Sequence, residues 1–311
     1  MYYPFLRGKQ YELIMLREMA AKISKSGIVP IIEPVKKNFS SLRKTLDKLV
    51  ENNCRFIIVS NPSVGELKEN SAALFEEIIK NYPIRNNNLS IALILSPASS
   101  LEDAERFIRT GDGKISFIHS GFSEGSKLAS LIAKLGAKIE EHIFADSEDN
   151  ILYRRHFKTD KRILIKDGFR SQKNSEYPLS ESFSELYLTY NELGMNGFGD
   201  YLIAGKEFRE GGGPAYAIAI HLTYIEPEAD GIICVKHFKS TRVNTPKDPA
   251  GKFLEALEKL IKDCNSNPNI LNTEAVKEFR SLYERKHFPG LGYVKKLSMQ
   301  HHIELISSLE N

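Results

Sequence analysis

The feature that most constrains the fold is a series of eight short apolar runs separated by segments of helical length. The runs are rich in Ile, Val and Leu, and most of them end in a polar or charged residue. Strands read this way when a parallel sheet buries both of their faces. The runs are IVPIIEPV (28–35), FIIVSN (56–61), SIALILS (90–96), KISFIHSG (114–121), KIEEHIFADS (138–147), KRILIKDG (161–168), GDYLIAGK (199–206) and AYAIAIHLTYIE (215–226).

Amphipathic helices are expected between these runs. A helix over 9–25 precedes the first run, and further helices are expected over 40–52, 66–80, 123–136 and 180–194. Ser99 or Ser100 caps one more helix, which stops at Gly111. This alternation predicts right-handed βαβ units. Eight strands without a glycine-rich dinucleotide fingerprint favour a closed (β/α)8 barrel over an open doubly wound sheet.

We therefore predict an α/β fold with two parts. Residues 1–250 form a TIM-barrel-like domain with a helix before its first strand, and residues 251–311 form a helical C-terminal extension packed on the barrel. The turn-like EPEADG separates the eighth run from another β-rich run, which predicts a hairpin. Strand eight is therefore either extended or accompanied by an extra antiparallel strand.

Composition narrows the class of protein. Hydrophobic residues make up 41% and charged residues 27% of the 311 residues, as in ordinary globular proteins. The net charge of +3 gives no bulk signal for nucleic-acid binding. Three widely spaced cysteines fit a reducing compartment, and we find neither a signal-peptide layout nor an apolar run of about 20 residues. We expect a cytoplasmic protein with no membrane association.

The first candidate site gathers polar residues at the ends of the predicted strands, where barrel enzymes carry their working residues. Two carboxylates with a histidine can bind a divalent cation or perform acid–base chemistry, and a lysine can form a Schiff base or hold a phosphate. Polar residues at strand ends are also expected simply because these ends meet water. The candidate catalytic residues are Glu33, His119, Asp146, Lys166 and His221.

Two further segments are candidates for anion binding. In GKEFREGGGPAYA (205–217), three consecutive glycines stand beside cations and can cradle a phosphate, although a flexible connection explains them equally. In PFLRGKQYEL (4–13), two cations flank Gly8 before a helix, although they can also be solvated while nearby aromatic residues plug the barrel. The ligand-binding candidates are Lys9, Arg7, Lys206, Arg209, Gly211, Gly212 and Gly213.

Other polar groups are weaker candidates. Cys234 and His237 lack the second pair that a structural zinc site needs. His301 and His302 are adjacent in a helix and cannot face one ion well. The cluster over 153–156 can contact nucleic acid or form a solvated helix face.

Three stretches resemble the beta-protein-like family of phages and bacteria, which is named after the beta protein of a T-even phage. They are YPFLRGKQYELIMLREM, IVPIIEPV and FGDYLIAGKEFREGGGPAYAIAIHLTY, and the resemblance covers about residues 1–240. It implies a role in bacterial anti-phage defence beside a protein partner encoded nearby. It favours as site residues Arg7, Lys9, Glu33, Asp200, Gly211, Gly212, Gly213 and His221.

The functional expectation combines these observations. We expect a phosphate-bearing ligand, a nucleotide or a nucleic-acid end, at the barrel mouth, with phosphoester hydrolysis as the candidate reaction and a divalent cation as the candidate cofactor. The alternative is a non-catalytic scaffold or regulatory subunit that binds a nuclease-like or toxin-like partner. The charge-rich segments 255–264 and 274–288 would then form the binding surface.

Overall fold

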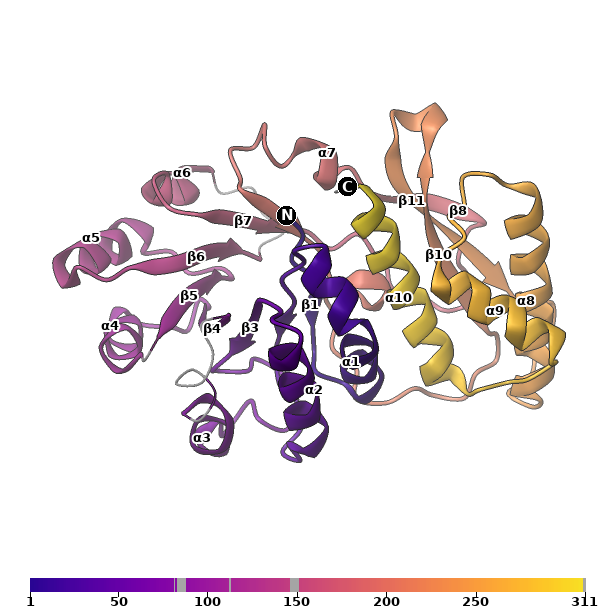
Figure 1. The fold of residues 1–311 in the computed structure, drawn as a ribbon, viewed down its shortest axis with the longest axis horizontal. Coiled ribbons are helices and arrows are strands. Elements are labelled where there is room, and N and C mark those ends of the chain that lie inside the picture. Colours follow the sequence, from indigo (N-terminus) through magenta and orange to yellow (C-terminus); the bar gives the residue numbers. More distant parts are fainter. Residues whose placement is uncertain (81, 83–87, 112, 146–150, 310–311) are drawn as a thin grey trace. The chain divides into compact units, whose positions relative to one another are not determined.

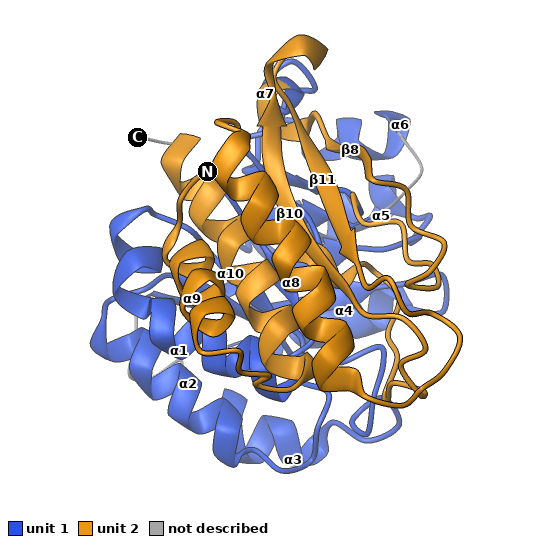
Figure 2. Ribbon diagram, turned by 90° about the vertical axis from the view of Figure 1, so that its right-hand side faces the viewer, with its two compact units in different colours: residues 1–167, 189–201 blue, residues 168–188, 202–311 orange. Residues whose placement is uncertain are grey.

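The computed structural model describes residues 1–311 except 81, 83–87, 112, 146–150 and 310–311. The chain forms two compact units, coloured separately in Figure 2. Unit 1 consists of residues 1–167 and 189–201, and unit 2 of residues 168–188 and 202–311. The expected boundary at residue 250 does not coincide with this division.

Unit 1 is a parallel barrel whose strands alternate with helices, which confirms the TIM-barrel-like fold (Figure 1). The barrel closes because Tyr2 and Phe198 form a parallel bridge and the backbone N–H of Tyr3 donates to Phe198 O at 2.8 Å. In hydrogen-bonded order the strands are β1 (Phe5–Leu6), β2 (Ile31–Ile32), β3 (Phe56–Val59), β4 (Leu89–Leu95), β5 (Lys114–His119), β6 (Ile139–Phe144), β7 (Arg162–Ile165) and β9 (Gly197–Gly199).

Two strand assignments made from the sequence are wrong. The first barrel strand is β1, which precedes helix α1 (Gln10–Lys25) rather than following it. The run 215–226 contributes a strand to a different sheet and not to the barrel. The first assignment failed because β1 has only two residues and directly follows Pro4, so the short apolar stretch before Arg7 lacks the length of a typical strand.

Glycine is required where β9 meets the N-terminal strand. A Cβ at Gly199 would lie 2.0 Å from the carbonyl oxygen of Tyr3, and one at Gly197 would lie 2.8 Å from that of Met1. Two backbones can approach this closely only where no side chain intervenes. The GFG sequence of β9 is therefore a closure element of the barrel.

Helices of unit 1 lie on the outer side of the strands (Figure 1). The expected helix over 66–80 is shorter, because only α3 (Ala72–Leu74) and the π-helical turn Phe75–Ile79 form. Ser100 caps α4 by accepting the N–H of Asp103 at 3.1 Å. The other helical segments are α2 (Ser40–Glu51), α4 (Leu101–Thr110), α5 (Gly125–Leu135), α6 (Ile151–Arg154) and the 3₁₀ turn Arg155–Phe157.

Unit 2 contains a three-stranded antiparallel sheet in the order β10–β11–β8. Its strands are β8 (Ser180–Ser184), β10 (Ala219–Glu226) and β11 (Ile232–Lys239), and the predicted hairpin around EPEADG is confirmed. The expected helix over 180–194 is wrong: this segment forms β8 and then the short α7 (Leu186–Thr189).

The helices of unit 2 are α8 (Pro249–Ser266), α9 (Glu274–Glu284) and α10 (Leu291–Leu309). Ile220 and Leu222 of β10 pack with α8 and α9 in one apolar core. Helix α10 is tied to β10 through two buried histidines. His301 bonds the carbonyl oxygen of Thr223 at 2.7 Å and His302 bonds its hydroxyl at 3.0 Å. Within the described residues, we find no helix that is both long and apolar enough to cross a membrane.

Candidate functional site

Glu33 follows β2 at the carboxyl end of the barrel strands and is completely buried. One of its carboxylate oxygens accepts the backbone N–H of Ser63 at 2.6 Å and the Ser63 hydroxyl at 2.8 Å. The other oxygen pairs with the guanidinium of Arg7. Because both oxygens are engaged, Glu33 is held as a structural counter-ion rather than as an available base.

Arg7 lies over the rings of Phe5 and Tyr201, with 5.1 Å and 5.6 Å from its guanidinium carbon to the ring centroids. Its side chain is only 12% exposed, and burial lowers its pKa from the ordinary value. Phe5 and Tyr201 belong to the apolar filling of the barrel. Arg7 therefore covers the apolar filling at the mouth, and the interpretation of Arg7 as a solvated cation is wrong because its guanidinium is mostly buried against Glu33.

The remaining candidates from the N-terminal motif and the strand ends do not gather around Glu33 and Arg7. Lys9 is half-buried as the N-cap residue of α1, and the backbone N–H of Lys166 donates to Gly199 O at 3.1 Å beside the closure point. Asp200 is buried and accepts the hydroxyl of Tyr2 at 2.8 Å. Asp146 lies outside the described residues.

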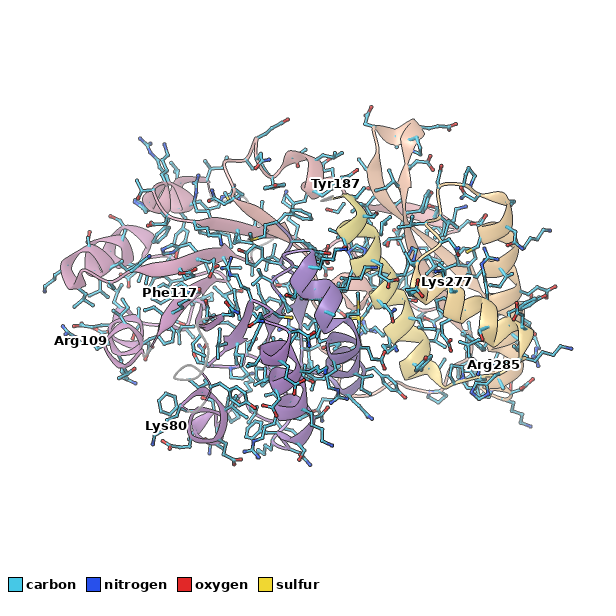
Figure 3. All side chains as sticks on the ribbon, in the orientation of Figure 1. Lys80, Arg109, Phe117, Tyr187, Lys277 and Arg285 are labelled. Carbon is cyan, nitrogen blue, oxygen red and sulfur yellow. The ribbon has the colours of Figure 1, made fainter. Side chains whose placement is uncertain are left out.

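His119 was expected at the mouth, but the structure places it in the layer between the strands and the outer helices. Its Nδ1 lies 2.6 Å from the Tyr153 hydroxyl, and its Nε2 lies 2.9 Å from Nδ1 of His142. Phe117, which is labelled in Figure 3, lies on the same face of β5. Its ring centroid is 5.7 Å from that of Phe107 in α4. Ile118 is the neighbour that points into the barrel, so the side chain of His119 points away from the barrel interior.

His221 was also expected at the barrel mouth, and it belongs to unit 2 because β10 is not a barrel strand. It is half-buried and faces His237 across the β10–β11 ladder. The two Nδ1 atoms are 2.7 Å apart, and Nε2 of His237 lies 3.1 Å from a carboxylate oxygen of Glu181 on β8. Three strands thus supply one hydrogen-bonded chain.

The chain of hydrogen bonds fixes where the protons lie. An ionised carboxylate only accepts, so Nε2 of His237 donates to Glu181. Nδ1 of His237 then accepts the N–H of His221, which leaves a lone pair on Nε2 of His221. Among the described residues, no hydrogen bond is formed by this nitrogen. A histidine in this state can act as a general base.

Aromatic rings hold the pair in position. Tyr177 stacks on His237, with centroids 4.5 Å apart and planes 20° apart. Phe169 and Tyr177 meet His221 edge-on at 5.1 Å and 4.8 Å. Burial lowers the pKa of His221 well below its ordinary value and that of His237 to about 4. The pair is therefore neutral at pH 7.

Positive side chains surround this cluster. The charges of Lys295 and Lys239 further lower the pKa of His221 and of His237, respectively. Arg170 is 77% exposed and lies 3.8 Å from Glu181. Arg209 acts on Tyr177, whose pKa is raised chiefly by burial and lowered in part by that guanidinium. An anion beside His221 would find four cations near the same hydrogen-bonded chain.

The glycine-rich loop has a different form from the expected phosphate cradle. Gly211, Gly212 and Gly213 are exposed, have no positive φ, and would meet open space if they carried side chains. The loop leads into β10 rather than into a helix, so no helix N-terminus adds its N–H groups there. Lys206 is half-buried, and Arg209 pairs with Glu207 at 2.7 Å.

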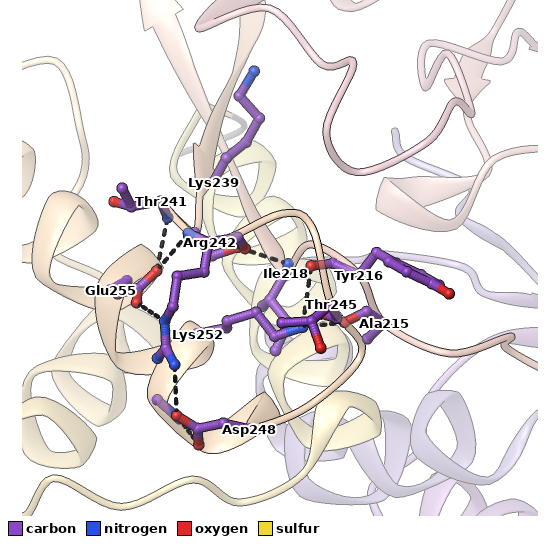
Figure 4. Close-up of polar contacts among 12 residues, drawn as sticks. Ala215, Tyr216, Ile218, Lys239, Thr241, Arg242, Thr245, Asp248, Lys252 and Glu255 are labelled. Atoms are coloured by element: carbon purple, nitrogen blue, oxygen red, sulfur yellow. Dashed lines mark hydrogen bonds and ion pairs between the residues drawn. The ribbon is translucent and has the colours of Figure 1, made fainter.

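A buried lysine anchors the end of this loop. Nζ of Lys252 donates to the carbonyl oxygens of Tyr216 at 3.0 Å, of Thr245 at 2.8 Å and of Ala215 (Figure 4). Asn174 donates to the carbonyl oxygen of Ala217 at 2.8 Å, which ties the loop to the segment that carries Tyr177. The C-terminal end of the loop is therefore fixed to the segment that carries Tyr177, which stacks on the histidine pair.

The sequence prediction named His221 but missed His237, Glu181 and Tyr177. A signal for His237 existed in the hairpin. Glu226 pairs with Ile232, and His221 and His237 are each five residues from this pair, so they must face each other. No comparable signal marks Glu181, because it comes from a segment that the pattern assigned to a helix.

The geometry does not suit a metal ion. Two nitrogen ligands of a tetrahedral zinc ion lie about 3.4 Å apart, given bonds of about 2.0–2.1 Å, whereas the two Nδ1 atoms are 2.7 Å apart. In the described part of the chain, no group of three or more His, Cys, Asp and Glu side chains is arranged to hold a metal. The expected divalent cation has no protein site among these residues.

No family model matches this chain, and no curated protein is similar to it in sequence. The resemblance to the beta-protein-like family therefore stays an expectation based on motifs. A functional proposal must rest on the geometry of the two units.

Proposed function

We propose that unit 2 binds a phosphate-bearing ligand beside His221 and that His221 acts as the general base in hydrolysis of its phosphoester bond. The observation that carries this proposal is the chain from His221 through His237 to Glu181. This chain leaves a lone pair on Nε2 of a half-buried histidine. Arg170, which lies 3.8 Å from Glu181, and Lys239, whose ammonium donates to the carbonyl oxygen of Tyr177, place positive charge at the cluster and favour an anionic ligand.

The proposed reaction needs no group beyond water and these side chains. A water proton moves to Nε2 of His221 while the water oxygen forms a bond to phosphorus. The bond from phosphorus to the leaving oxygen breaks, and that oxygen takes up a proton from the imidazolium. Glu181 stays ionised throughout and stabilises the positive charge that forms on the histidine pair.

The test is a panel of phosphoesters, including nucleotides, phosphorylated oligonucleotide ends and aryl phosphates. Wild-type protein should release phosphate or a phosphate monoester from at least one of them, and His221→Asn should lose about 10²-fold or more in rate. His287→Asn is the matched control, because His287 is an exposed histidine of the same unit. Equal rates for wild type and His221→Asn would remove the proposed base.

We further propose that this hydrolysis serves the anti-phage defence role that the family resemblance implies. If hydrolysis at His221 serves defence, cells that carry the gene with its neighbour should lower phage plating efficiency. The His221→Asn variant should abolish this protection, and His287→Asn should keep it. Protection by His221→Asn at the wild-type level would separate defence from the histidine pair.

A second candidate function is a non-catalytic scaffold for a nuclease-like or toxin-like partner. The observation that favours it is the saturated Glu33–Arg7 pair, which leaves unit 1 without an available base at Glu33. Lys277 of α9 and Arg285, which follows the last residue of α9, are exposed and pair with Glu274 and Glu278 of that helix (Figure 3). Replacing Lys277 and Arg285 with Glu tests this surface by co-purification with the neighbouring gene product. Retained co-purification would assign the interface elsewhere.

A further inference from the structure

The neutral histidine pair of unit 2 carries two protons, one shared between the rings and one on Nε2 of His237, and its fourth ring nitrogen can take up an additional one. One proton lies in the hydrogen bond between the two Nδ1 atoms, and Glu181 accepts the Nε2–H of His237. The remaining position is Nε2 of His221. A proton added there turns His221 into an imidazolium, whose charge spreads along a chain that ends at a carboxylate.

The surroundings decide whether this additional proton binds. Lys295 of α10 and Lys239 of β11 place positive charge on the pair, and Arg170 partly neutralises Glu181 from 3.8 Å. From the segment that stacks on the pair, Tyr177 and Phe169 contribute rings, and Arg209 acts on Tyr177. These groups oppose protonation while no anion is bound. A bound anion would weaken this positive field and so favour protonation of the pair.

We propose that a terminal, dianionic phosphate group binds beside His221 together with one proton, which the His221–His237 pair takes up. This inference rests on the proposed function because it uses the same site, but it requires only binding and no turnover. The new N–H at Nε2 of His221 donates a charge-assisted hydrogen bond to a phosphate oxygen. A protonated His221 cannot accept a proton from water, so the hydrolysis proposed above proceeds through the fraction of complexes in which Nε2 is unprotonated.

The ligand class follows from the charges. A terminal phosphate carries close to two negative charges at neutral pH, whereas a phosphodiester carries one. A dianion offsets more of the positive field at the pair than a monoanion does, so it favours the imidazolium more strongly. We therefore expect phosphate monoesters to bind more tightly than the corresponding methyl diesters, and the difference should vanish in His221→Asn.

Calorimetry with inorganic sulfate tests the proton coupling. Sulfate stays a dianion across the neutral pH range, so a proton taken up on binding goes to the protein. Titrations at pH 7 in two buffers with different ionisation enthalpies should show uptake of about one proton per sulfate. The dissociation constant should rise about tenfold per pH unit above neutrality. His287→Asn should behave as wild type, and His221→Asn should bind sulfate without proton uptake.

Each outcome has a distinct meaning. Sulfate binding without proton uptake in the wild type, or equal uptake in His221→Asn, overturns the coupling and leaves the hydrolytic proposal standing. Proton-coupled binding without turnover of any ester overturns hydrolysis alone. Absence of sulfate and inorganic phosphate binding at millimolar concentration overturns the anion site itself. If His221→Asn fails to fold, nitrogen NMR of the wild-type histidine rings during sulfate titration replaces it, and an unchanged Nε2 signal of His221 overturns the coupling.

Discussion

Nδ1 of His221 and Nδ1 of His237 lie 2.7 Å apart on neighbouring strands of unit 2, and His237 is held in turn by Glu181 at 3.1 Å. The His221–His237 contact is a hydrogen bond between two imidazoles, and either ring could donate. Glu181 accepts from His237, and this sets the donor in both hydrogen bonds. The hydrogen-bonded chain runs across β8, β11 and β10 and leaves the lone pair on Nε2 of His221. It can be tested by replacing the carboxylate.

Glu181→Gln should retain the fold and disturb the tautomers of the pair. The amide can donate as well as accept, so His237 no longer has to carry its proton on Nε2. Nitrogen NMR of the ring nitrogens should show Nε2 of His237 and Nδ1 of His221 protonated in the wild type and a mixture in the variant. For an ester that the wild type hydrolyses, kcat should fall about 10²-fold.

The control for Glu181 is Glu176→Gln, which changes an exposed carboxylate that pairs with Lys173 at 3.2 Å. It should leave the tautomers and kcat unchanged. A wild-type tautomer pattern in Glu181→Gln would show that another group orients the histidines.

Glu33→Gln should destabilise unit 1 strongly. The change leaves the buried guanidinium of Arg7 without its counter-ion, and breaking such a pair typically costs about 3–5 kcal/mol. Glu66→Gln is the matched control, since Glu66 pairs with Lys36 at 2.8 Å while both side chains are 40% or more exposed. Its effect should be much smaller than that of Glu33→Gln, because solvent screens an exposed ion pair. Urea unfolding measures both, and equal effects would contradict the structural role of Glu33.

Gly199→Ala should disrupt closure of the barrel. The added Cβ would lie 2.0 Å from the carbonyl oxygen of Tyr3, and both backbones are fixed by the β1 to β9 contact. We expect a loss of several kcal/mol or failure to fold, because backbone atoms cannot rotate away as a side chain can. Gly212→Ala, where a Cβ meets open space, should change stability by less than about 0.5 kcal/mol. A stable Gly199→Ala protein would contradict the closed barrel.

Stability should fall as the pH drops below about 6.5. Burial lowers the pKa of His142 to about 3, and those of His301 and His237 to about 4. These groups titrate near 6.5 in the unfolded chain, so between about pH 6.5 and 4 the unfolded chain binds protons that the folded chain does not. The free energy of unfolding should therefore decrease by up to about 1.4 kcal/mol per pH unit for each histidine.

Urea unfolding at several pH values between 4.5 and 7.5 measures this dependence. His301→Gln should lose part of the stability at pH 7.5, because Thr223 and Thr273 lose a partner. The free energy of unfolding of this variant should change less steeply with pH than that of the wild type, and the difference should equal the contribution of one histidine. An unchanged slope would show that His301 already titrates normally in the folded protein.

The sequence by itself determined the class of the fold and one important register. Apolar runs without polar alternation can only be buried on both faces, which identified parallel strands between helices, and the EPEADG turn identified the hairpin of β10 and β11. The turn also fixes that His221 faces His237, because pairing in a hairpin follows from distance to the turn. Glu33 could be assigned to a strand end because it follows the apolar residues of the run 28–35.

Tertiary structure alone decided which strands close the barrel and which way their side chains point. The two-residue β1 is stabilised by its neighbours β2 and β9 and not by local propensity, so it leaves no signal in the sequence. In β5, both Ile118 and Phe117 are apolar because both faces are buried, so the outward direction of His119 could not be read from periodicity. Glu181 reached the histidine pair because β8 joined a sheet formed by residues about 50 positions away, and such long-range pairing depends on packing rather than on local sequence.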